Sequence, residues 1–185
     1  MQQIFERVKK IILNPRDALA EVKTEEIVIG DFMKEYVAIV AAVPAIAQFI
    51  GLIGRGNLFS ILLFVVLGYV VNLVVVFVFG KVLEALAQTF GGVKNTEDAF
   101  KLAAYSYTPY FIAGIFNINP ALSILAVLGG LYGIYILYLG VPTLMESPQD
   151  KALAYAAVSI IIMIIISFVL GLLVASVAGV GYMAG

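Results

Sequence analysis

One short group of polar side chains interrupts an apolar stretch of this sequence: Tyr105, Ser106, Tyr107 and Thr108, followed by Pro109. A proline inside a helix deprives the carbonyl four residues earlier, here that of Tyr105, of its backbone partner. Neighbouring hydroxyls can satisfy such a freed backbone group inside a membrane. The group therefore predicts either a structural hinge or a ligand or ion site on a kinked helix, and Asn72 is a further polar side chain that could line such a site.

The sequence contains no histidine and no cysteine. These absences remove the usual proton shuttle, the commonest transition-metal ligand and all thiolate chemistry. No paired carboxylates, no glycine-rich phosphate loop after a strand and no serine–lysine dyad are found either. We therefore expect no catalytic residue, no cofactor and no metal site, and the sequence favours a protein that is not an enzyme.

Four stretches lack Asp, Glu, Lys and Arg altogether, namely residues 36–54, 56–80, 102–145 and 152–185. Uncharged apolar runs of ~18 residues or more are typical of helices that cross the ~30 Å hydrocarbon core. Hydrophobic residues make up 63% of the chain and charged residues 12%, against roughly 45–50% and 25% in soluble domains. The sequence therefore predicts an all-α, polytopic membrane protein, and its net charge of −1 gives no basis for a nucleic-acid partner.

The stretch 102–145 is too long for one membrane-spanning helix, because a helix of that length would extend about 66 Å. The turn formers Asn117, Asn119 and Pro120 divide it into two. A transmembrane domain over residues 36–185 is therefore predicted, with five spans at about 36–53, 58–87, 102–116, 121–141 and 153–177. Residues 142–150 are predicted to form a polar loop.

Residues 1–35 are predicted to form a segment outside the membrane. Apolar residues recur at helical spacing over residues 1–13, which indicates an amphipathic helix, and Asn14 and Pro15 are typical of the start of a second short helix. We expect both helices to coat the cytoplasmic face. Ten of the eleven basic residues fall on one side of the five-span arrangement, so the positive-inside rule places the N-terminus in the cytoplasm and the C-terminus outside the cell membrane.

Two stripes of small residues occur in the predicted spans. The first is the pair Gly129 and Gly133, and the second comprises Ser167, Gly171 and Ala175. Small residues four apart allow two helix backbones to approach closely. Both stripes are predicted to be helix-packing surfaces within the chain, with self-association as the alternative.

Several short motifs resemble those of the Yip family of small five-span membrane proteins, which are named for their interaction with Ypt/Rab GTPases. The similar motifs are Asn14-Pro15-Arg16 with Ala18, Gly91-Gly92, Ala104-Tyr105-Ser106 with Pro109, and the run from Leu131 to Pro142. The resemblance implies five spans, a cytoplasmic N-terminal region and a role in membrane shaping or trafficking. The N-terminal region is short and lacks the Asp-Leu-Tyr-Gly-Pro motif of eukaryotic members, so the sequence is more similar to prokaryotic members and a GTPase partner is not expected.

Two functions are therefore open. The first is a non-enzymatic membrane scaffold or partner-binding protein in membrane organisation or trafficking, with membrane lipid, other membrane proteins or a second copy as partners. The alternative is a small channel or transporter whose polar path runs by Tyr105, Ser106, Thr108 and Asn72. A polar tunnel at mid-bilayer beside these residues would favour transport, whereas a tightly packed apolar interior would favour the scaffold.

Overall fold

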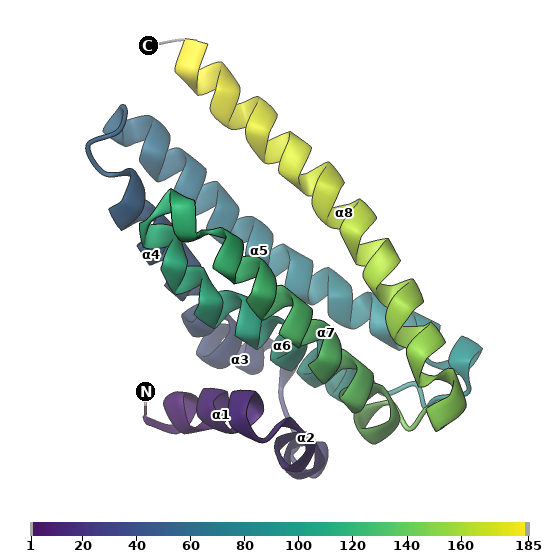
Figure 1. Cartoon of the computed structure of the whole chain (residues 1–185). Helices are drawn as coiled ribbons and strands as arrows, with labels where there is room; N and C mark the ends of the chain where they lie inside the picture. Colours follow the sequence, from purple (N-terminus) through teal and green to yellow (C-terminus); the bar gives the residue numbers. More distant parts are fainter. Residues whose placement is uncertain (1, 184–185) are drawn as a thin grey trace.

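The computed structural model describes residues 2–183, without the side chains of residues 120, 175 and 177–183. The chain forms eight α-helices within this range (Figure 1). They are α1 Gln2–Leu13, α2 Pro15–Lys23, α3 Ile29–Phe32, α4 Ala38–Leu52, α5 Leu58–Leu86, α6 Thr96–Ala113, α7 Ile124–Leu144 and α8 Gln149–Met183. One turn of π-helix, Met33–Val37, joins α3 to α4, so the two are continuous.

The fold is that of an all-helical membrane protein, as the sequence predicted. Four segments are long and apolar enough to cross a bilayer: Ile29–Leu52, Leu58–Leu86, Ile124–Leu144 and Gln149–Val174. The fifth long helix is α6, which begins with Glu97, Asp98 and Lys101 and is less apolar than the others. It tolerates this composition because α4, α5 and α7 surround it, so that most of its side chains contact protein.

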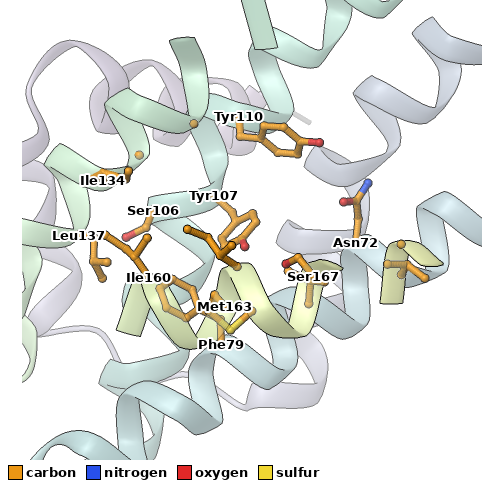
Figure 2. A pocket seen from close by; sticks show the side chains of 16 residues that line it. Asn72, Phe79, Ser106, Tyr107, Tyr110, Ile134, Leu137, Ile160, Met163 and Ser167 are labelled. Carbon is orange, nitrogen blue, oxygen red and sulfur yellow. The ribbon is translucent and has the colours of Figure 1, made fainter. Parts of the chain in front are cut away.

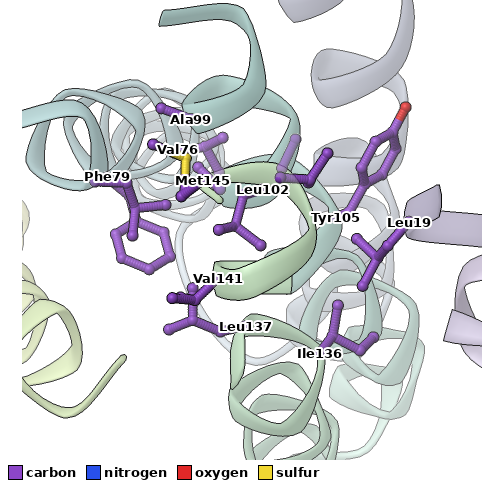
Figure 3. Close-up of a cluster of buried hydrophobic side chains, with 14 of the residues drawn as sticks. Leu19, Val76, Phe79, Ala99, Leu102, Tyr105, Ile136, Leu137, Val141 and Met145 are labelled. Atoms are coloured by element: carbon purple, nitrogen blue, oxygen red, sulfur yellow. The ribbon is translucent and has the colours of Figure 1, made fainter. Parts of the chain in front are cut away.

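The close approach of α6 and α7 depends on glycine. A side chain at Gly133 would meet the backbone carbonyl oxygen of Ser106, and a side chain at Gly129 would meet that of Pro109. The first pair of small residues therefore lies at a helix–helix contact within the chain. Figure 3 shows part of the hydrophobic core, with Leu102 between side chains of several helices.

Helix α7 continues past the predicted end of its span. Pro142 was expected in a loop, but it lies inside the helix, which ends at Leu144. Prolines also lie inside α4 and α6, at Pro44 and Pro109. Membrane helices accommodate internal proline because neighbouring helices and side chains satisfy the freed backbone groups, so proline is a weaker helix terminator here than in a soluble domain.

The N-terminal helices belong to the same core as the bundle. Helices α1 and α2, which we call the N-terminal hairpin, lie beside α6 and α7 (Figure 1). Ile11, Ala18, Leu19 and Val22 have no exposed surface, and Leu19 reaches Gly140 of α7. The apolar side of the hairpin therefore contacts protein, which fixes its position on the bundle.

Helix α8 is held at its beginning and diverges from the bundle towards its end (Figure 1). The Tyr155 hydroxyl donates a hydrogen bond to the Leu83 carbonyl, and the Tyr155 ring stacks on Phe90 with 5.1 Å between centroids. From Ile164 onwards the described side chains of α8 are exposed or only half-buried. The first part of α8 is thus part of the core, and the later part leaves a gap beside α6.

Candidate functional site

A cavity of about 480 Å³ lies where α8 leaves the bundle, between α5, α6, α7 and α8 (Figure 2). Its wall is mainly aliphatic and aromatic, with Phe79, Leu137 and Met163 among the lining residues. The volume is within the ~300–1,000 Å³ that is usual for small-molecule sites. The cavity is therefore large enough to hold a ligand.

Five polar side chains line the cavity: Asn72, Ser106, Tyr107, Tyr110 and Ser167. Tyr107 on α6 and Ser167 on α8 face the cavity from different helices (Figure 2). Ser106 is only 6% exposed, and its hydroxyl has no hydrogen-bond partner among the described residues. The lining residues include no Asp, Glu, Lys or Arg, so the polar character of the cavity comes from hydroxyl groups and one amide.

The structure divides the polar group predicted around Pro109 between two faces of α6. Ser106 lies in the cavity with Asn72, whereas Tyr105 and Thr108 lie elsewhere in the core. The Tyr105 ring packs edge-on against Tyr36 with 5.2 Å between centroids. Thr108 donates to the carbonyl of Ala104 at 2.9 Å, and its hydroxyl is 2.9 Å from that of Tyr36. Tyr105 and Thr108 therefore join a packed part of the core, and they do not continue a polar path from Asn72.

The two stripes of small residues also have different surroundings. Gly129 and Gly133 contact the backbone of α6, and Gly133 also borders the cavity, whereas Ser167 and Gly171 line the cavity from α8. Among the described residues, no atom outside the adjoining backbone of α8 lies within 4 Å of the position that a side chain at Gly171 would take. The side chain of Ala175 lies outside the described residues. The described part of the α8 stripe thus faces open space, where the sequence predicted a packed helix.

A second polar cluster, which the sequence analysis missed, attaches the N-terminal hairpin to the bundle. Lys101 is 1% exposed, and its ammonium group lies 2.9 Å from Asp98. It also donates to the carbonyls of Val22 at 2.9 Å and Glu25 at 2.7 Å. Oppositely charged residues three positions apart, as Asp98 and Lys101 are, commonly occur at solvent-exposed helix ends. Nothing in that spacing reveals that the end of α2 covers this pair.

Lys23 completes this cluster from the other side. Its ammonium group contacts Asp98 at 2.8 Å, Glu146 at 2.7 Å and the Leu144 carbonyl at 2.9 Å. Burial alone would lower the pKa of Lys23, but the hydrogen bonds to Asp98 and Glu146 outweigh it and raise the pKa above its usual value. The side chain therefore stays charged at neutral pH and links α2 to α6 and to the end of α7.

Within the hairpin, Arg7 on α1 bonds Glu25 at 2.6 Å. Burial opposes the charge of Arg7, but the bond to Glu25 prevails and its pKa is raised. Lys10 contacts Glu21 and lowers the pKa of that carboxyl. Among residues 2–183, no three or more acidic side chains gather into a group that could hold a metal ion. The arrangement is that of an ionic attachment between structural elements.

Comparison with known proteins gives consistent matches along the chain. The family model of the Yip1 domain matches residues 9–180, which include α2, the ionic cluster and the cavity. Inner membrane protein YohC of Escherichia coli strain K12 is 27% identical over 183 residues, covering 91% of this chain and 94% of YohC. YohC of Escherichia coli strain O6:H1 gives the same values. No solved structure matches.

Proposed function

The chain belongs to the Yip1 domain family, and we propose that it is a non-enzymatic scaffold that binds other membrane proteins through its N-terminal hairpin. On this proposal the protein contributes to membrane organisation or trafficking. The observation that carries the proposal is the ionic cluster of buried Asp98 and Lys101 with half-buried Lys23, which holds the hairpin on the bundle.

Burying charged groups is costly unless each is paired, and in some proteins such pairs fix one arrangement of the fold without adding stability. In this chain the arrangement that Lys101 defines is the position of α2, because it binds the carbonyl of Val22 in the last turn of that helix and that of Glu25 just beyond it. A binding surface that is already fixed loses less conformational entropy when a partner docks. The cluster therefore supports a role for the hairpin as a preformed surface.

The outward face of the hairpin carries charges of both signs, including exposed Glu6, Lys9, Arg16 and Asp17. A surface that binds anionic lipid through charge alone would be enriched in Lys and Arg. The mixed charges favour a protein partner.

We propose that this face lies in the cytoplasm, because ten of the eleven basic residues fall on that side. YohC is an inner membrane protein, which supports the cell membrane as the place where this protein acts. We do not propose a GTPase as its partner.

Photo-crosslinking in native membranes tests the proposal. A photoreactive amino acid replaces Lys9 on the exposed side of α1, and a control chain carries it at Ile161, which is 57% exposed on α8. We expect discrete protein adducts from position 9 and mainly lipid adducts from position 161. The variant Lys101→Met should weaken the adducts at position 9, because it loosens the hairpin. Repeated absence of any protein adduct at position 9 would refute the proposal.

The cavity supports a second candidate, a small channel or carrier. Asn72 and Ser106 line it at the middle of their helices, although Tyr105 and Thr108 lie on another face. Solute and ion flux into liposomes tests this function. If it is correct, Asn72→Leu should reduce flux, and Thr108→Val should leave it unchanged because Thr108 does not line the cavity. Zero flux of the unmodified protein for several ions and solutes would exclude it.

A further inference from the structure

We propose that the cavity between α8 and helices α5–α7 binds a neutral lipid with one long apolar chain and a small hydroxyl or carbonyl head. This inference is independent of the scaffold function, because the cavity and the N-terminal hairpin are separate features. It rests on three properties of the cavity: an open wall on α8, an unpartnered buried hydroxyl on α6, and a lining without charge.

The wall on α8 leaves room for a chain. Ser167 and Gly171 line the cavity, and in the part of the chain that the structure describes a side chain at Gly171 would meet no other helix within 4 Å. On α7, Gly133 also borders the cavity, but a side chain there would meet the backbone carbonyl oxygen of Ser106. The space beside Gly171 lies along an apolar membrane helix, so the surrounding molecules that can fill it are lipid chains.

The hydroxyl of Ser106 supplies a reason for a polar head on the ligand. It is 94% buried, lines the cavity and has no partner among the described residues. A buried hydroxyl without a hydrogen bond costs free energy. A hydroxyl or carbonyl on the ligand would supply that bond, and the amide of Asn72 and the hydroxyl of Tyr110 lie on the same lining (Figure 2).

Charge and size narrow the class of ligand. Since the lining holds no cationic side chain, a phosphate or carboxylate head would enter without a counter-ion. An apolar cavity of ~150 Å³ holds benzene, so by proportion the volume of about 480 Å³ corresponds to roughly 20 carbon atoms. A neutral lipid with a single chain satisfies both conditions.

The chain contains no tryptophan, so a single introduced tryptophan can report contact with brominated lipids, which quench its fluorescence. Ile160→Trp places the reporter on the cavity lining, and Ile161→Trp places it one residue further on the exposed side of α8. The probes are dibromostearyl alcohol, dibromostearic acid and dibromooctadecane, which share one chain and differ in the head. We expect saturable quenching of Ile160→Trp by the alcohol, with weaker binding of the acid and the alkane.

Three further variants assign the site. Ser106→Ala should weaken binding of the alcohol about fivefold, as the loss of one hydrogen bond implies. Gly171→Leu should abolish saturable quenching by filling the cavity. Gly68→Leu is the matched control, because Gly68 on α5 also faces open space but does not line the cavity, and it should leave binding unchanged.

Three different results would each overturn a different part of this proposal. Quenching that rises linearly with probe content at both tryptophan positions would show that the cavity only admits bulk lipid, which would overturn the proposal. Equal binding of acid and alcohol would overturn the neutral class. Efficient disulfide dimers of Gly171→Cys, in a chain without other cysteines, would assign the cavity to a helix of a second copy. The photo-crosslinking result at position 9 is unaffected by any of these outcomes.

Discussion

The contact between α6 and α7 gives a quantitative prediction for Gly133→Ala. The added carbon would overlap the backbone carbonyl oxygen of Ser106. Backbone atoms cannot rotate away as a side chain can, so the two helices must separate. Overpacking of this kind costs about 1–3 kcal/mol, while replacing a helical glycine by alanine returns about 0.5–1 kcal/mol. We expect a net destabilisation of about 1–2 kcal/mol.

Gly130→Ala is the matched control for this prediction. Gly130 is in the same helix, and its nearest contact would be a ring carbon of Tyr110 at 3.9 Å, which is ordinary van der Waals distance. It should therefore be neutral or slightly stabilising. At about 2–4 °C per kcal/mol for a chain of this size, Gly133→Ala should denature about 2–8 °C below the parent protein.

The measurement is thermal denaturation in detergent, followed by the loss of the monodisperse peak in size-exclusion chromatography. Both variants are purified in the same detergent, so that effects of the micelle cancel in the comparison. If Gly133→Ala denatures at or above the temperature of Gly130→Ala, the close backbone contact at α6 is absent and the described packing is incorrect.

Three further predictions concern the buried polar contacts. Lys101→Met should destabilise the protein by about 3 kcal/mol, because Asp98 loses a buried partner. The control Lys94→Met, at an exposed lysine, should change stability by less than about 0.5 kcal/mol. Thermal denaturation distinguishes the two variants. Tyr36→Phe should cost about 1 kcal/mol through loss of its hydroxyl contact at 2.9 Å, and an unchanged denaturation temperature would contradict this. Burial lowers the pKa of Lys23, but its carboxylate partners raise it above the usual 10.5. The contribution of Lys23 to the free energy of unfolding is therefore complete below pH 10.5 and is lost as pH rises through the higher folded-state pKa. The fluorescence of a tryptophan that replaces exposed Phe5 should report release of the hairpin only in that alkaline range.

The long apolar helices could be predicted from the sequence because lipid-facing segments must be apolar on nearly all sides. The position of α6 could not be derived in this way. Asp98 and Lys101 lie in its first two turns, and both are buried beneath the end of α2. Such burial depends on contacts between residues about eighty positions apart, and no local pattern encodes them.

The N-terminal hairpin shows a second limit of sequence patterns. The spacing of apolar residues over residues 1–13 predicted an amphipathic helix correctly, and α1 covers Gln2–Leu13. Amphipathicity shows that one side of a helix needs an apolar neighbour, but lipid and protein both meet that need. The full burial of Ile11 and Leu19 identifies protein as the neighbour.

The candidate site was predicted only in part. Asn72 and Ser106 were identified as polar groups in apolar stretches, and the structure places both on the cavity lining. Tyr105 and Thr108 were grouped with them because they are adjacent in sequence. Successive residues of a helix point about 100° apart, so neighbours in the chain need not share a face. The cavity itself depends on the direction of α8, which the sequence does not encode locally.

Helix α8 is attached to the bundle near its beginning, so a small tilt there would displace its later residues. The contact at Tyr155 fixes the beginning of the helix. Ser167 lies twelve residues further along, about 18 Å from Tyr155 along the helix axis. A tilt of about 10° at Tyr155 would therefore move Ser167 by about 3 Å, which is comparable to the width of an alkyl chain. Such a tilt would move the Ser167 side of the cavity and would leave the close contact between α6 and α7 unchanged.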